Sequence, residues 1–300
     1  MWLLLAFTSA ALLGLYDVAK KQAVTENAVL PVLLLNALFS MLIFSPTLLS
    51  AEFGWGWFEG TMCETLSLGW DAHFAIMIKA VIVLSSWITG FYAIKHLPLT
   101  IAGPINATRP VMTLVGAMLI FGERLNMWQW GGVLLSVFSL FLLSRSGRKE
   151  GIKFESNGWI LLLMVAAFLG AVSGLYDKHI MKTLHPVFVQ GWYNVYQFIL
   201  MSVIVSCIWL PNRKNSTPFK WRWAIPLISI FISLADFAYF SALTDQDAMI
   251  SVVSMVRRSS VIVSFACGAL LLREKNLRSK AFDLLLILVG MILLYIGSKG

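Results

Sequence analysis

Long apolar runs, broken by short polar connections, dominate the chain. Several runs reach roughly 18 to 20 residues, the length that a helix needs to cross the hydrocarbon core of a bilayer. They lack the alternating pattern of outer-membrane strands. Hydropathy predicts ten helices, over residues 2–20, 29–50, 73–95, 100–121, 126–144, 157–178, 186–210, 221–243, 248–271 and 278–297. The sequence therefore predicts an all-α polytopic membrane protein with ten transmembrane helices.

The two halves of the chain carry the same local markers in the same order. The polar segment 144–157 separates five predicted helices from the next five. The markers are Gly14-Leu15-Tyr16-Asp17 and Gly174-Leu175-Tyr176-Asp177, Pro31 and Pro186, and the turns Gly122-Glu123-Arg124-Leu125 and Arg273-Glu274-Lys275-Asn276. Such ordered recurrence indicates an internal duplication, with repeats at 1–145 and 155–298. Because each repeat has an odd number of helices, we expect the repeats to be inverted in the membrane.

Composition and charge narrow the class further. Hydrophobic residues make up 59% of the chain and charged residues only 13%, so lipid is the expected solvent. The net charge of +8 resides mostly in clusters between apolar runs, which set membrane orientation and do not indicate nucleic-acid binding. The odd-numbered connections hold 15 Lys and Arg residues, against 4 in the even connections and termini. The positive-inside rule then predicts that both termini lie outside the cell.

The five-plus-five layout resembles a known family, the EamA-like branch of the drug/metabolite transporter superfamily. The resemblance rests on that layout, on the close helix pairs three-four and eight-nine, and on the two Glu-containing turns, which are followed by Gly131-Gly132 and Gly290. It implies export or exchange of small metabolites through a central cavity lined by both repeats, and cytoplasmic termini. Two features depart from the family: the acidic, Trp-rich connection 51–72, and the lack of a Glu in the first helix. Proton coupling is therefore not inherited by analogy.

A few ionisable residues fall inside the predicted spans. Arg109, Asp236, Arg257 and Arg258 lie well within helices four, eight and nine. A charge near the bilayer centre costs at least ~2.5 kcal/mol, so such residues normally face a cavity or a partner. The excess of guanidinium groups favours an anionic substrate group, which Arg binds through two donors. The alternative is a structural network in which Asp236 pairs with one Arg.

Polar and aromatic residues supply the other candidates. Asn106 and Tyr239 lie close in sequence to Arg109 and Asp236 and join them as candidate substrate-binding residues. Candidate cavity walls are Tyr16, Tyr176, Trp87, Tyr92, Trp192, Tyr193, Asn194 and Gln197. For any one aromatic residue, helix packing or the interfacial belt is the competing interpretation. Asp17 and Asp177, with Tyr16 and Tyr176 beside them, are candidate gates, or solvated helix ends.

We therefore predict a secondary transporter, not an enzyme, in the inner (plasma) membrane. It would move a small anionic or zwitterionic metabolite, such as an amino acid, a carboxylate or a phosphate or phosphonate compound, by alternating access. The alternatives are a membrane-embedded lipid-modifying enzyme and a non-transporting accessory protein. No cofactor, metal or nucleic acid is expected, because the chain lacks nucleotide-binding, metal-ligand and hydrolase motifs. The expected partners are a small-molecule substrate and the lipid bilayer, and the sequence leaves monomer and homodimer open.

Overall fold

The computed structural model describes residues 2–61, 63–64, 68–109, 111–112, 126–148, 157–180, 183–243, 256–257, 259–270 and 277–299. Over this part the chain is helical, with no strand. The first half contains α1 (Trp2–Val24), α2 (Val29–Glu52), α3 (Trp70–His96), α4 (Leu99–Ala107) and α6 (Met127–Arg148). The second half contains α7 (Gly158–Ile180), α8 (Pro186–Ile204), the π-helical turn η1 (Val205–Trp209), α9 (Ala224–Leu243), α11 (Ser260–Leu270) and α12 (Leu277–Lys299).

The predicted all-helical class is confirmed, and the helix boundaries differ by a few residues. α1 continues to Val24 and not to residue 20, and α6 continues to Arg148 and not to residue 144. The predicted helix 186–210 is divided between α8 and η1. Parts of the predicted helices 100–121 and 248–271 fall outside the described residues. Four described helices are long and apolar enough to cross a membrane, over Val29–Glu52, Trp70–His96, Gly158–Asp177 and Pro186–Trp209.

Proline and lysine residues fix several helix ends. Pro186 is the first residue of α8, where its missing N–H removes no helical hydrogen bond. Pro98 separates α3 from α4 with only Leu97 before it. The last carbonyls of α3 have no partner within their helix. Lys21 Nζ donates to the carbonyls of Ile94 (2.7 Å) and Leu97 (2.6 Å) and so ties α1 to this tight turn.

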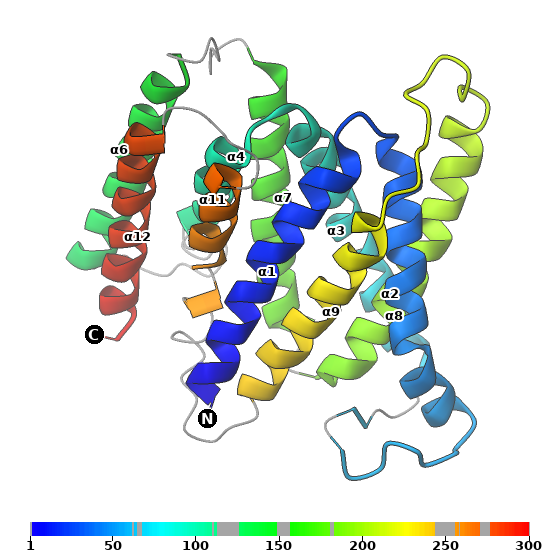
Figure 1. Cartoon of the computed structure of the whole chain (residues 1–300). Helices are drawn as coiled ribbons and strands as arrows, with labels where there is room; N and C mark the ends of the chain where they lie inside the picture. Colours follow the sequence, from blue (N-terminus) through cyan, green and yellow to red (C-terminus); the bar gives the residue numbers. More distant parts are fainter. Residues whose placement is uncertain are drawn as a thin grey trace.

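The principal helix contacts pair the two halves in a regular way. α1 packs along α9 and α3 along α7; α2 packs on α9 and α8 on α3. α2 also packs on α8, α4 on α11 and α6 on α12 (Figure 1). Exchanging each helix of the first half with its counterpart in the second maps these pairs onto one another. This is the pattern that a two-fold relation between the halves produces.

Contacts along the helices also establish their directions. Arg222, just before α9, bonds Gln22 near the end of α1, and Ala235, further along α9, bonds Ser9 nearer the start of α1. α9 is therefore antiparallel to α1. On α3, Lys79 pairs with Asp177 and the later Ser86 bonds the earlier Ala166, so α3 and α7 are also antiparallel. The end of α1 lies against the end of α3, through Lys20 on Phe91 and Lys21 on Ile94, so these two helices run parallel. The first helices of the two halves, α1 and α7, therefore run in opposite directions. Both chain ends lie on the same side of the molecule (Figure 1).

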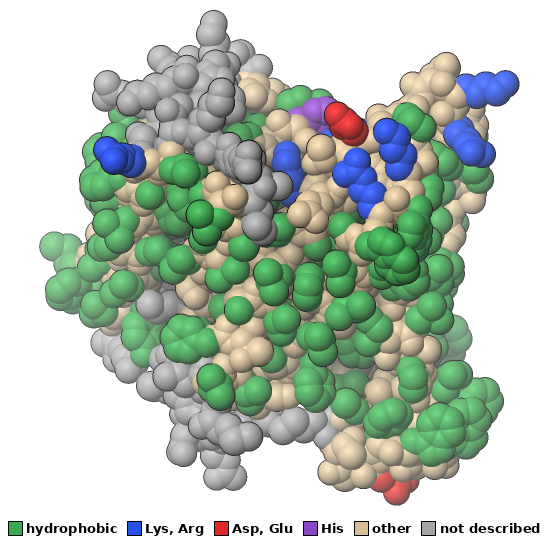
Figure 2. Space-filling view, viewed as in Figure 1, with side chains coloured by type: hydrophobic (Ala, Val, Ile, Leu, Met, Phe, Trp, Pro, Cys, Tyr) green, Lys and Arg blue, Asp and Glu red, His purple; other side chains and the backbone are tan. Residues whose placement is uncertain are grey.

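The surface has the layout of a protein embedded in lipid. On the face in Figure 2, a broad apolar and neutral belt separates charged side chains at the two ends, and Lys and Arg gather along the upper edge. Exposed cations on the connection between η1 and α9 include Arg213, Lys214 and Lys220. A hollow of about 480 Å³ is lined by Lys21, Gln22, Thr25, His96, Leu97, Pro98 and Arg222.

Candidate functional site

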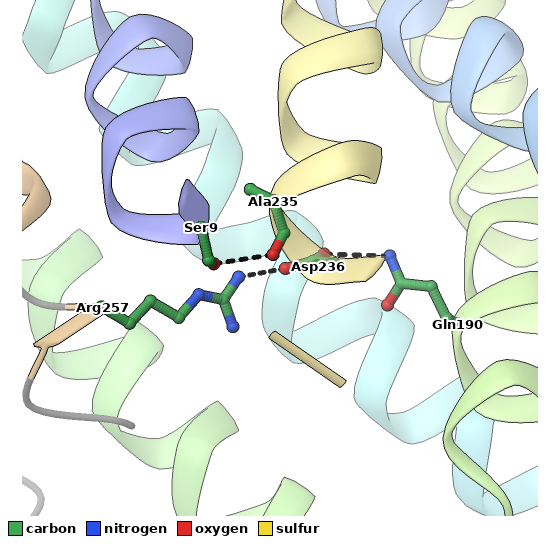
Figure 3. A network of polar contacts seen from close by, with 5 residues as sticks. All are labelled: Ser9, Gln190, Ala235, Asp236 and Arg257. Carbon is green, nitrogen blue, oxygen red and sulfur yellow. Dashed lines mark hydrogen bonds and ion pairs between the residues drawn. The ribbon is translucent and has the colours of Figure 1, made fainter. Parts of the chain in front are cut away.

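An ion pair between Asp236 of α9 and Arg257 forms the first part of the site. An Arg257 terminal nitrogen donates to Asp236 Oδ1, and Gln190 Nε2 donates to Oδ2 over 3.2 Å. Figure 3 shows Arg257 and Gln190 reaching the carboxylate from opposite sides. The Arg257 guanidinium also lies over the Tyr239 ring, with its Cζ 4.3 Å from the ring centre. Both carboxylate oxygens are thus engaged, whereas the Arg257 Nε has no partner among the described residues and is a donor that a ligand could use.

A hydrogen bond beside this pair fixes the backbone that carries it. Ser9 Oγ of α1 donates to the carbonyl oxygen of Ala235 over 2.7 Å, within the interior (Figure 3). Ser9 is fully buried. The bond holds α9 against α1 at the residue before Asp236, and so links the pair to the contact between α1 and α9.

Arg109 forms the second part of the site, on α4's side of the bundle. Its NH2 nitrogen donates to Asn106 Oδ1 over 3.3 Å, one turn earlier. Its guanidinium lies directly on Gly170 of α7, where an added Cβ would stand 2.9 Å from Cζ. A glycine is required there for the guanidinium to lie this close to the α7 backbone.

Charged residues of α1 face Arg109. The charges of Lys20 and Arg109 act on the Asp17 carboxylate, and Tyr16 lies within reach of the charges on Asp17, Arg109 and Asp236. Tyr16 therefore lies within electrostatic range of both parts of the site. Lys20 is buried, with Nζ 4.1 Å from the Phe91 ring centre, an arrangement that stabilises a cation through the face of the ring.

The burial of Lys20 corrects one sequence-based assignment. The 15 Lys and Arg residues attributed to the odd-numbered connections include Lys20, at the end of the predicted helix 2–20, but only 7% of Lys20 is exposed. The reason is the length of α1, which runs one turn past residue 20 and so keeps both Asp17 and Lys20 within the bundle.

A second ion pair joins α3 to α7. Lys79 Nζ lies 2.6 Å from Asp177 Oδ1 and 5.3 Å from the centre of the Tyr193 ring. The Tyr176 hydroxyl donates to the Ala75 carbonyl over 3.1 Å in the same region. Among the described residues near the bundle axis, the cations Lys20, Lys79, Arg109 and Arg257 outnumber the carboxylates Asp17, Asp177 and Asp236.

The aromatic candidates divide between the axis and the periphery. Trp87 packs on Tyr193 with ring centres 6.5 Å apart, next to the Lys79 pair. Trp192 packs on His73, and Tyr92 lines a separate hollow of about 130 Å³ with Lys95 and Trp209. The structure therefore brings Trp87 to the charged centre and gives Trp192 and Tyr92 other neighbours. Asn194 is buried on α8, and Arg258 lies outside the described residues.

Sequence reasoning missed three residues of this site. Lys79 lies inside the predicted span 73–95, in which the only other Lys or Arg is the last residue, Lys95. A lone cation inside a predicted span is a signal that hydropathy alone provides. Gln190 and Gly170 carried no such signal, because each acquires its role from a partner on another helix. Gln190 touches Asp236 and Gly170 accommodates Arg109.

The fold and the charges around its axis define a multi-pass helical membrane protein. The sequence profile of the EamA-like transporter family matches residues 1–145 and again residues 157–296. The chain belongs to this family, whose members move small molecules across membranes, and the resemblance noted from the sequence is confirmed. A solved structure described only as "Crystal structure of protein" covers 99% of this chain and 97% of its own, with a TM-score of 0.61. At 15% identity that likeness supports the fold alone. No curated protein matches the sequence.

Proposed function

We propose that the protein is a secondary transporter of the inner (plasma) membrane that moves a small anionic or zwitterionic metabolite. The observation that carries this proposal is the partly buried pair of Asp236 and Arg257, with Arg109 as a second guanidinium within the bundle. A guanidinium within a membrane span is costly unless an anionic group uses it. Among the described residues, the Asp236 carboxylate occupies only part of the Arg257 donors and the Arg257 Nε is unpartnered, so an incoming carboxylate or phosphate completes the set.

Alternating access is the mechanism that we propose, and the packing of the two halves, which we take as two inverted five-helix repeats, supports it. α1 and α7 run in opposite directions, and the pairs α1 with α9 and α3 with α7 are equivalent under exchange of the halves. Rocking of one equivalent pair while the other stays closed opens the axis to one side of the membrane at a time.

The gates in this proposal are the matched acidic positions. Asp177 closes one side through Lys79, with Tyr176 bonded to α3 beside it. Asp17, facing Lys20 and Arg109 with Tyr16 next to it, closes the other. The first gate is an ion pair between the two halves, and the second is a charge cluster of α1 and Arg109 within the first half. An entering substrate anion can loosen either gate by competing for the cation.

Transport by the purified protein in liposomes tests the proposal. L-glutamate, succinate and glycerol 3-phosphate serve as anionic probes, and tetraethylammonium serves as the cationic one. We expect uptake of at least one anionic probe, and about a tenfold or greater loss in Arg257→Gln, because the lost charge-assisted bonds are worth about 1.5–3 kcal/mol. Arg213→Gln, at an exposed position on the connection before α9, is the matched control and should transport normally.

The opposite outcomes are distinct. Preferred uptake of tetraethylammonium would make Asp236 the recognition residue and Tyr239 part of a cation-binding wall. Absence of uptake of all four probes would favour an accessory or enzymatic role. Normal anion uptake by both Arg257→Gln and Arg109→Gln would leave the arginines with a structural role only.

A further inference from the structure

Buried neutral side chains with polar atoms that lack a hydrogen-bonding partner among the described residues gather on three helices beside the charged pair. Among the described residues, the polar atoms concerned are Nδ2 of Asn36, Oγ of Ser40, Nδ2 of Asn194, both amide atoms of Gln197 and Oγ of Ser233. We call these residues the neutral seam: Asn36, Ser40, Asn194, Gln197 and Ser233. Each is at most 6% exposed. Polar groups left unpaired inside a membrane span are unfavourable, because no water is available from the surrounding lipid.

The seam residues lie on inward faces of their helices. On α8, Asn194 and Gln197 share one face with Gln190, since spacings of three, four and seven residues bring side chains together. On α9, Ser233 shares a face with Ser229 and Asp236 for the same reason. The α8 and α9 stripes therefore both lead to the contact between Gln190 and Asp236, which joins them.

α2 closes the seam from the third side. It packs on both α8 and α9, and Asn36 and Ser40 are one turn apart on it. Ser229 Oγ donates to Asn36 Oδ1 over 2.8 Å, which places Asn36 against the α9 stripe and leaves its Nδ2 without a partner. Gln197 approaches the Tyr193 hydroxyl, beside the Lys79 pair, without completing a well-formed hydrogen bond. The seam thus adjoins both ion pairs of the proposed site.

We propose that the neutral seam binds the uncharged polar part of the transported molecule, while Arg257 binds its anionic group. This inference rests on the proposed function and names its substrate class: small anions or zwitterions that carry a hydroxyl or amide group. Gln197 lies seven residues from Gln190 and Ser233 three from Asp236, so the hydroxyl or amide lies about 5–10 Å along the helices from the charged group. Amide and hydroxyl side chains offer donors and acceptors without charge, which suits a neutral partner and not a second ion.

Isosteric substrate pairs test the seam in proteoliposomes. L-threonine has a hydroxyl group where L-valine has a methyl group. Glycerol 3-phosphate carries two hydroxyl groups that propyl phosphate lacks. A buried site built to bind a hydroxyl rejects the analogue that lacks it, so we expect wild-type uptake to favour the hydroxylated member of at least one pair by about tenfold or more. Gln197→Leu and Ser233→Ala should lower that ratio toward one while uptake of the apolar member persists.

Ser202→Ala is the matched control on α8. Ser202 is half-buried and its hydroxyl already donates to the carbonyl of Phe198 over 2.8 Å, so this change should leave the ratio unaltered. A stability readout accompanies transport: Gln197→Leu should unfold at the same or a higher temperature in detergent, because it removes unpaired buried atoms. Lower stability together with an unchanged ratio would mean that the seam has only a packing role, and would overturn the proposal.

Failure of this inference is distinguishable from failure of the proposed function. If wild-type protein transports both members of each pair equally, transport stands and the seam proposal is wrong. If Ser233→Ala and Gln197→Leu both keep the wild-type ratio, the hydroxyl is recognised elsewhere and the seam proposal is also wrong. If none of the four compounds, and none of the anionic probes above, enters the liposomes, the proposed function fails and this inference fails with it.

Discussion

Lys79 of α3 and Asp177 of α7 form an ion pair, Nζ to Oδ1 2.6 Å, that joins a helix of the first half of the chain to one of the second. The two side chains are unequally buried: 8% of the Lys79 side chain is exposed, against 35% of the Asp177 side chain. A charge left alone is more unfavourable where it is less hydrated. The lysine therefore depends on the pair more than the aspartate does.

This asymmetry predicts the order of two single substitutions. Asp177→Asn strands the buried Lys79 ammonium and should lower the free energy of unfolding by about 2 kcal/mol or more. Lys79→Met leaves a partly exposed carboxylate and should have a smaller effect, about 1 kcal/mol or less. Thermal unfolding of the purified variants in detergent measures both. The reverse order would contradict the argument from unequal burial, and no effect from Asp177→Asn would show that the pair does not hold α3 and α7 together.

The contact between Gly170 and Arg109 allows the guanidinium to be displaced without removing it. In Gly170→Ala the new Cβ would stand 2.9 Å from Arg109 Cζ, and the flexible side chain must move while the α7 backbone can stay. If Arg109 binds substrate, we expect transport to fall about tenfold or more at nearly unchanged stability, because a misplaced bidentate donor loses its geometry.

Gly174→Ala is the control for this test. It lies one turn further along α7, and a Cβ there would meet no described atom within 4 Å. Full transport in both variants would mean that the position of Arg109 is irrelevant to the substrate. Loss in both would point to α7 helix geometry and not to the guanidinium.

Hydropathy was sufficient to predict the all-helical class and the approximate position of the described helices, because each span must satisfy its backbone hydrogen bonds internally. Proline placement gave the start of α8 correctly. Partners on distant helices were beyond the sequence: Lys79 meets Asp177, and Gln190 meets Asp236, only through the packing of α3 on α7 and the approach of α8 to α9. The misassigned Lys20 shows the same limit, since a single extra turn of α1 moves its charge from the connection into the interior.

Moving Lys20 from the first connection into the interior changes the charge count behind the predicted membrane orientation only slightly. Removing Lys20 from the odd-numbered connections leaves 15 − 1 = 14 Lys and Arg residues there against 4 elsewhere. We therefore predict that both termini lie outside the cell. Alkaline phosphatase fused after residue 300 should be active, and green fluorescent protein fused there should stay dark. A fluorescent C-terminal fusion would reverse the assignment and agree with the orientation implied by the family resemblance.

Single and double variants of Asp236 and Arg257 distinguish a structural role of the pair from a role in substrate recognition. Removing one partner strands the other, so Asp236→Asn and Arg257→Gln should each destabilise the protein, by about 2 kcal/mol given their partial burial. Replacing both by leucine removes both charges, and apolar pairs of this kind are often as stable as the ions they replace. If the pair only ties α9 to its neighbour, the double variant should regain stability and transport together.

If the pair recognises the substrate, stability and transport should change independently in the double leucine variant. The double variant should unfold near the wild-type temperature and yet fail to take up the anionic probe, because the donors that bind it are gone. Ser9→Ala provides the comparison, since Ser9 bonds the Ala235 backbone beside the pair without touching either charge. It should lose about 1 kcal/mol of stability and keep the substrate preference of the wild type. Recovery of anion uptake by the double leucine variant would assign the pair to packing and would leave Arg109 as the remaining described guanidinium near the axis.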